Sequence, residues 1–82
     1  MKFRIHVRII PRGGLLDPQG QAVEHALSSL GYATVSGVRV GKAIELSVDA
    51  RSAEEARSAV TTMCDRLLAN PVTEDYVIEV EA

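Results

Sequence analysis

Residues 2–9 alternate strictly between apolar and polar side chains, and this pattern restricts the fold more than any other feature of the chain. One face of the segment is apolar and the other is basic: Phe3, Ile5, Val7 and Ile9 against Lys2, Arg4, His6 and Arg8. A period of two residues is typical of a β-strand with one buried face. Pro11, Gly13 and Gly14 follow, and these residue types favour the end of a strand.

A helix is predicted after this strand. Asp17 suits the N-cap, and Pro18 suits the first helical position because its φ angle is already fixed. Gly31 suits the position just beyond the helix. Four apolar residues recur at helical spacing between these ends: Val23, Ala26, Leu27 and Leu30. This stripe predicts a helix with one buried face.

Two strands joined by a short turn are predicted next. Valines at alternating or near-alternating positions indicate the first of them, interrupted by Ser36 and Gly37: Val35, Val38 and Val40. The second alternates between two faces: Ile44, Leu46 and Val48 against Glu45, Ser47 and Asp49. Because a connection as short as Gly41-Lys42 joins the two runs, we expect a β-hairpin.

A second helix and a last strand complete the pattern. Ser52 and Glu55 form a capping box, and Asn70-Pro71 ends the helix because proline cannot continue it. The expected buried stripe of this helix is Ala56, Ala59, Val60, Met63, Cys64 and Leu67. The last strand alternates between two faces: Tyr76, Ile78 and Val80 against Val77, Glu79 and Glu81.

The resulting order, β-α-β-β-α-β, predicts an α+β fold of the ferredoxin-like (split βαβ) plan, with residues 1–82 as a single domain. Two helices would cover one face of a four-stranded antiparallel sheet and leave the other face open. The first strand would lie between the third and fourth, which places a basic strand between two acidic ones. Either cross-strand charge pairing or a polar subunit contact would explain this arrangement.

Size and composition favour an oligomer or a partner subunit. A domain of 82 residues buries only about 60% of the surface of its unfolded chain, so its core supplies little stability. Cys64 is the only cysteine, which excludes an internal disulfide. The net charge of −2 does not suggest a nucleic-acid-binding protein, and no apolar run approaches the ~20 residues of a membrane span. Without a secretory segment, the expected compartment is the cytoplasm.

Catalytic and metal-binding constellations are not found in the sequence. Cys64 lies on the apolar stripe of the second helix, where a small buried hydrophobe is the better interpretation. His25 is expected on the surface, and His6 has no nucleophile beside it. Metal-ligand spacings and phosphate-binding glycine loops are absent. With only three aromatic residues, the sheet also lacks the stacking surface of an RNA-binding domain.

Three segments carry a family resemblance over essentially the whole chain. They are L-L-D-P-Q-G at residues 15–20, V-R-V-G-K at residues 38–42 and L-L-A-N-P-V-T-E-D-Y at residues 67–76. Together with the basic alternating strand, in this order and spacing, they resemble PurS, the small subunit of bacterial phosphoribosylformylglycinamidine synthase. Departures are small: Thr73 replaces a frequently aliphatic residue, and Gly13-Gly14 occupies a variable loop.

The resemblance implies a non-catalytic subunit in de novo purine synthesis. The assembled enzyme uses ATP and glutamine to convert formylglycinamide ribonucleotide to formylglycinamidine ribonucleotide. A glutaminase subunit releases ammonia, and a large synthetase subunit binds ATP and magnesium, so no cofactor is expected in this chain. The small subunit is a dimer or tetramer that bridges the other two and supports ammonia transfer. The candidate contact residues are Asp17, Arg39, Lys42, Asn70 and Tyr76, although Asp17 and Asn70 also have ordinary helix-end roles.

Two other functions stay open at this point. The first is a ferredoxin-like regulatory domain that binds a small ligand, with an anion held by the loops at Gly13-Gly14 and Gly41-Lys42. The second is an acylphosphatase-like enzyme, which would need an arginine in a phosphate loop and a positioned asparagine. Arg12 and Asn70 are the residues available for that chemistry, but Asn70 lies at a helix end.

Overall fold

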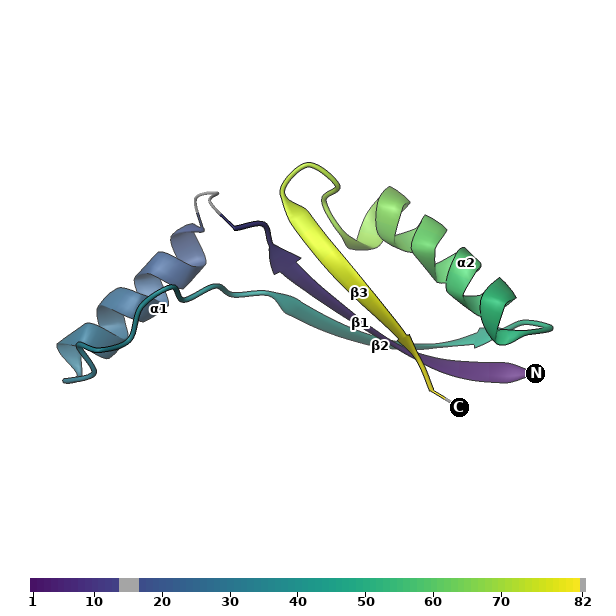
Figure 1. The fold of residues 1–82 in the computed structure, drawn as a ribbon, viewed down its shortest axis with the longest axis horizontal. Coiled ribbons are helices and arrows are strands. Elements are labelled where there is room, and N and C mark those ends of the chain that lie inside the picture. Colours follow the sequence, from purple (N-terminus) through teal and green to yellow (C-terminus); the bar gives the residue numbers. More distant parts are fainter. Residues whose placement is uncertain (14–16, 82) are drawn as a thin grey trace.

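The alternating N-terminal segment forms the central strand of an antiparallel sheet. A computed structural model describes residues 1–13 and 17–81, in which the elements are β1 (Lys2–Pro11), α1 (Pro18–Ser29), β2 (Lys42–Asp49), α2 (Ala53–Met63), the π-helix η1 (Cys64–Leu68) and β3 (Glu74–Val80) (Figure 1). The strand order is β2-β1-β3. Ile5 lies opposite Leu46 on one side and Val80 on the other. The prediction that the basic strand lies between two acidic strands is confirmed.

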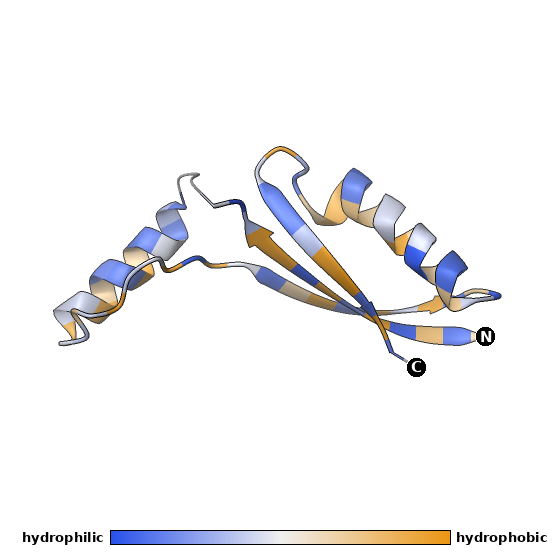
Figure 2. Ribbon diagram, in the orientation of Figure 1, coloured by the Kyte–Doolittle hydropathy of each residue, from blue (hydrophilic) through white to orange (hydrophobic). Residues whose placement is uncertain are grey.

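The core lies between β1 and α2. Ile5, Val7 and Ile9 are fully buried, as are Val60 and Cys64 from the helical side. Figure 2 shows apolar and polar residues alternating along the strands, as a sheet with one buried face requires. The interpretation of Cys64 as a buried hydrophobe is confirmed, and burial raises the pKa of its thiol. A buried neutral thiol is a poor nucleophile.

The predicted stripe of the second helix is only partly correct. Ser52 caps α2 as expected, because its Oγ accepts the Glu55 amide at 3.1 Å. Met63 and Leu67, however, are 39% and 82% exposed. The chain widens into a π-turn at this point, where the Ala69 amide donates to the Cys64 carbonyl five residues earlier. A π-turn rotates the following residues away from their α-helical positions, so Leu67 points outward and Ala69 is buried instead.

The predicted strand through Val35, Val38 and Val40 does not form within the described chain, and the hairpin prediction is wrong. Residues 35–41 form neither a helix nor a strand and do not pair with the sheet. The reason is competition for their amides. Val38 N donates to Glu24 Oε1 at 3.1 Å, and Val40 N donates to Asp17 Oδ2 at 3.0 Å. These bonds hold the segment along α1, so the chain runs directly into β2 without reversing at Gly41-Lys42.

The prediction that both helices cover the sheet is also wrong. Of the two α-helices, α2 packs on it together with its continuation η1, whereas α1 projects beyond the end of the sheet with the segment that follows (Figure 1). We call residues 17–41 the arm. The chain is consequently elongated, with extents of 51 × 25 × 14 Å. The apolar stripe of α1 is real but uncovered, since Val23 is 40% and Leu30 73% exposed.

Asp17 should make the thermal stability of the protein depend on pH in the acid range. Hydrogen bonds from the amides of Val40 and then Gly20 hold the pKa of Asp17 below its ordinary value of 3.8. A carboxylate whose pKa is lowered by folding stabilises the protein above the unfolded value, and this contribution is lost as pH falls. We expect wild type to have a higher melting temperature than Asp17→Asn at about pH 6, and the difference to shrink towards about pH 3. A difference that does not change with pH would contradict this role.

Because Ile5 is buried and the π-turn leaves Leu67 exposed, truncation of these two side chains should lower the free energy of unfolding by unequal amounts. Ile5→Ala should lower the free energy of unfolding by about 2–5 kcal/mol, as is usual for a fully buried isoleucine. Leu67→Ala should change it by no more than about 0.5 kcal/mol, because the side chain is already in solvent. Chemical denaturation at one protein concentration measures both. A large loss for Leu67→Ala would show that this side chain is buried.

Candidate partner-contact site

The five residues predicted to contact partners lie around one end of the sheet and the adjoining start of the arm. Because β1 runs antiparallel to both neighbours, its last residues lie beside the first residues of β2 and β3. The end of η1 and the N-terminus of α1 adjoin the same region (Figure 1). We call this region the loop end. Leu15 and Leu16, which belong to the first family segment, lie outside the described residues.

Arg12 organises the loop end, although it was not among the predicted contact residues. Its Nη2 donates to Pro71 O at 2.7 Å, its Nη1 to Val72 O at 3.3 Å and its Nε to Asp75 Oδ1 at 3.0 Å. Its own amide bonds Thr73 O at 2.9 Å. A guanidinium used in this way fixes a loop, and it is not placed to cradle a phosphate as an acylphosphatase requires.

Asn70 shapes the loop that Arg12 holds. Its side-chain Oδ1 accepts the Val72 amide at 3.0 Å, and its own amide donates to Glu74 Oε1 at 2.8 Å. A side chain that bonds the backbone two residues ahead is typical of an Asx-turn. Asn70 therefore sets the direction in which the chain leaves η1 and enters β3.

Lys42, Tyr76 and Arg39 each make a bond within the chain. Lys42 Nζ donates to Leu68 O at 3.2 Å, at the C-terminal end of η1, where a cation is favourable. Tyr76 donates its hydroxyl hydrogen to Asp65 Oδ1 at 2.8 Å, and this bond raises the pKa of Tyr76. Arg39 Nη1 donates to Pro11 O at 3.1 Å. All five predicted contact residues, Asp17 included, thus have structural roles, and their contact with partners stays a prediction.

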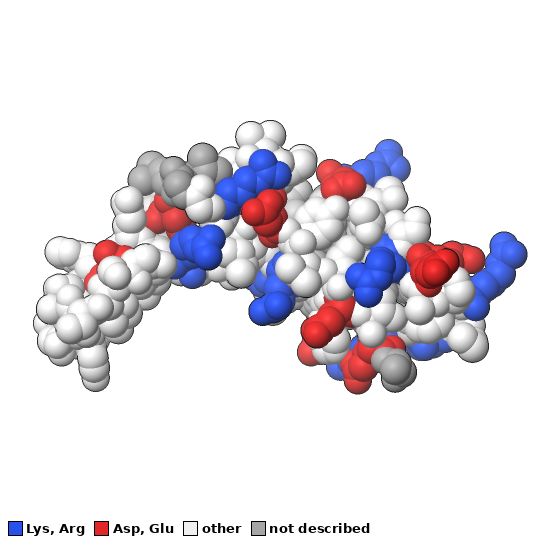
Figure 3. All heavy atoms as spheres, in the orientation of Figure 1, with Lys and Arg blue, Asp and Glu red and all other residues white. Residues whose placement is uncertain are grey.

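The open face of the sheet shows the expected cross-strand charge pairs. Arg4 lies 3.0 Å from Glu45 and 3.8 Å from Glu81. His6 lies 3.4 Å from Glu45 and 2.8 Å from Glu81. Figure 3 shows acidic and basic side chains intermixed around the sheet and α2, whereas the arm presents few charges on that side. The charge-pairing interpretation is confirmed, and such exposed pairs are each worth only about 0.2–1 kcal/mol.

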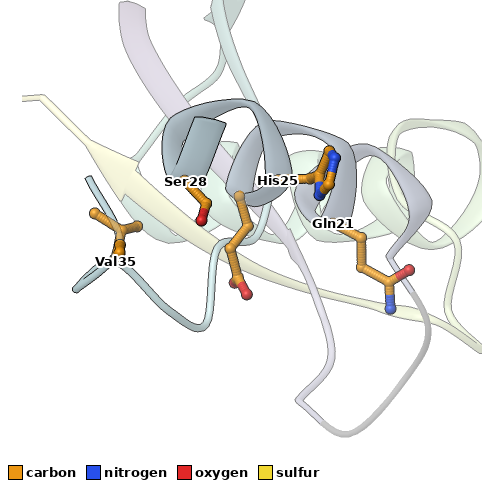
Figure 4. Close-up of a pocket in the computed structure, with 6 residues that line it drawn as sticks. Gln21, His25, Ser28 and Val35 are labelled. Carbon is orange, nitrogen blue, oxygen red and sulfur yellow. The ribbon is translucent and has the colours of Figure 1, made fainter. Parts of the chain in front are cut away.

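A hollow on the arm offers little chemistry. Its lining comes from one side of α1 and the segment that follows: Gln21, Glu24, His25, Ser28, Ala33 and Val35 (Figure 4). Glu24 already accepts the Val38 amide, so it is engaged in holding the arm together. Within residues 1–13 and 17–81, no group of three or more His, Cys, Asp or Glu side chains is placed to hold a metal ion. No helix in these ranges is long and apolar enough to span a membrane.

Curated proteins related to this chain share one name. Residues 4–82 match the family model described as PurS, phosphoribosylformylglycinamidine (FGAM) synthase. Phosphoribosylformylglycinamidine synthase subunit PurS from Synechocystis is 48% identical over 96% of this chain and 77% of its own length. The subunit of the same name from Bacillus subtilis is 44% identical over 96% of this chain and 93% of its own length.

Solved structures agree over the full length. Bacillus subtilis PurS superposes with a TM-score of 0.85 at 44% identity, covering 98% of this chain and 99% of the other. A chain in the structure of PurLQS from Thermotoga maritima superposes with a TM-score of 0.87 at 32% identity, covering 99% of both chains. The chain therefore belongs to the PurS family of phosphoribosylformylglycinamidine synthase subunits.

Proposed function

We propose that this chain is the non-catalytic subunit that assembles a glutamine-dependent phosphoribosylformylglycinamidine synthase. The observation that carries the proposal is the match, over 99% of both chains, to a chain in the PurLQS structure from Thermotoga maritima. The elongated shape fits this role, because a chain 51 Å long and 14 Å thick exposes much surface for its size. Its function is therefore expected to depend on the surfaces that contact other subunits rather than on a pocket.

In this proposal the reaction takes place in the neighbouring subunits, in the cytoplasm. The glutaminase releases ammonia, and the synthetase binds ATP and magnesium and activates the substrate amide. This chain, as a homo-oligomer, bridges the two and excludes water from the route between them. Ammonia released into solvent is lost, so contacts that exclude water preserve it for the synthetase.

The loop end and the open sheet face are the surfaces proposed to meet the other subunits. Arg12 and Asn70 fix the loop, so it is preformed and loses little entropy on binding. Arg39 is exposed and uses Nη1 for Pro11, which leaves its other donors for a partner carboxylate. The mixed charges of the sheet face suit the rim of a subunit interface.

Reconstitution with the synthetase and glutaminase subunits tests the assembly role. Adding this chain should restore FGAM formation from glutamine. Formation from ammonium salts by the synthetase should need it far less, because free ammonia does not have to be transferred between subunits. Full glutamine-dependent turnover in the absence of this chain would overturn the proposal.

Arg39→Ala tests the loop end separately. It should raise the concentration of this chain needed for half-maximal glutamine-dependent turnover by about tenfold, as expected for the loss of ~1.4 kcal/mol of binding. Arg51→Ala is the matched control, because Arg51 is 94% exposed in its side chain and lies beyond the opposite end of β2. Equal effects of the two substitutions would place the contact elsewhere.

A further inference from the structure

The two faces of the sheet differ in what covers them. On the side of α2, the β2 residues Ile44, Leu46 and Val48 are half-buried. On the open face, no element of the described chain packs, and the even-numbered residues of β1 are exposed or half-buried. The chemistry of this open face changes along the length of β1.

The middle of the open face is a closed set of ion pairs. Glu45 of β2 and Glu81, just beyond β3, each approach both Arg4 and His6 of β1, at distances between 2.8 and 3.8 Å. We call these four residues the charge ring. Each member already has partners within the chain, and removing such pairs from water costs free energy. The charge ring therefore offers little to another protein.

Arg8 lies on the same face, beyond the charge ring, and has no partner of this kind. Its side chain is exposed and makes no ion pair or hydrogen bond with the described residues. Directly across the sheet it faces Ala43 on β2 and Val77 on β3, and neither carries a charge. The guanidinium therefore keeps all of its N–H donors for solvent or for another molecule.

The carboxylates nearest to Arg8 in the sheet do not supply a partner. Asp75 is held by Arg12 at 3.0 Å. Glu79 is two residues along β3 from the position opposite Arg8, and it lies beyond ion-pair distance of the guanidinium. The diagonal that carries an ion pair from β1 to β2 in the charge ring leads here to Gly41, which has no side chain.

Apolar side chains surround this arginine. Val77 is 54% exposed and Ile10, two residues along β1 on the same face, is 39% exposed. Ala43 flanks Arg8 on the other side. Arginine is enriched at the centre of protein interfaces, whereas charged residues in general are depleted there. We call Arg8, Ile10, Ala43 and Val77 the arginine patch, and its composition is that of an interface centre.

We propose that the arginine patch binds a carboxylate of the synthetase subunit, presented beside an apolar side chain that packs on Val77 and Ile10. The planar guanidinium can hold a carboxylate through two parallel hydrogen bonds, and apolar neighbours that exclude water strengthen this pair. The charge ring then serves as the polar rim of the contact. The proposal rests on the assembly role given above and specifies where that role is carried out on the open face.

The position of the arginine patch favours the larger of the two partner subunits. Ile10 lies opposite Asp75, which Arg12 holds at the loop end, so the patch and the loop end are continuous. A single partner that contacts both regions must be large enough to extend around this end of the sheet. The synthetase is the large subunit of the proposed assembly.

Arg8→Ala tests the arginine patch in the reconstituted enzyme. It should raise the concentration of this chain needed for half-maximal glutamine-dependent turnover by about tenfold. Arg8→Lys should restore only part of this loss, because an ammonium lacks the planar fork of donors. The melting temperature should stay within about 4 °C of wild type, since Arg8 makes no side-chain bond in the described chain.

Lys2→Ala is the matched control. It removes the same charge from the same face of β1 at the opposite end of the strand, so the half-maximal concentration should not change. Equal effects of Arg8→Ala and Lys2→Ala would overturn the proposal. Val77→Glu places a carboxylate directly opposite Arg8 within the chain, so it should weaken assembly as Arg8→Ala does and leave the melting temperature unchanged.

Two more measurements identify the partner. Val77→Cys labelled with a short photo-crosslinker should attach to the synthetase, since the native Cys64 is buried and stays unlabelled. Attachment to the glutaminase or to a second copy of this chain would contradict the proposal. Glu79→Gln should not weaken assembly, and a loss equal to that of Arg8→Ala would show that Arg8 acts through Glu79 instead.

Failure of this proposal and failure of the assembly role give different results. If the Arg8 variants behave as wild type while the wild-type chain restores glutamine-dependent turnover, the arginine patch is wrong and the assembly role stands. If the wild-type chain itself does not restore turnover, both are wrong.

Discussion

The double pairing of β1 is the constraint on which the rest of this structure depends. From Arg4 onward its even-numbered residues bond β3 and its odd-numbered residues bond β2, so this part of its backbone is paired on both sides. That leaves Ile5, Val7 and Ile9 directed at α2 with no exposed surface. Because both neighbours are antiparallel to it, β1 also gathers the loop between η1 and β3, the start of β2 and the start of the arm at one end.

Local patterns predicted the elements that depend on local forces. Strict alternation located β1, β2 and β3, and capping chemistry located the starts of both helices at Asp17 and Ser52. Residues 35–40 have the composition of a strand, but their partners cannot be read from composition. Carboxylates on α1 hold two of their amides, and this competition is invisible to periodicity. The prediction that Leu67 is buried is wrong for a different reason. One π-turn changes the helical phase of the residues that it contains.

Sequence patterns predicted the region of the candidate site but not the hydrogen bonds that its residues make. The family segments led to the loop end, yet their residues there mainly bond the chain itself. Arg12 was missed because its acceptors are main-chain carbonyls about 60 residues later, and carbonyls leave no trace in side-chain patterns. A basic residue placed just after the central strand was the available signal. The function as a subunit was predicted from the family resemblance alone, because a contact surface has no short sequence motif of the kind that marks a catalytic site.

The half-covered sheet has a consequence for the supply of this subunit in the cell. If the homo-oligomer proposed above covers these apolar residues, the folding equilibrium of the chain depends on its own concentration. Newly made copies would then be least stable when they are scarce, because a copy without a partner leaves the half-buried row of β2 and the stripe of α1 exposed. Proteolysis of unaccompanied copies would favour the assembled subunit over the free chain, so that turnover and assembly are linked through the same apolar residues.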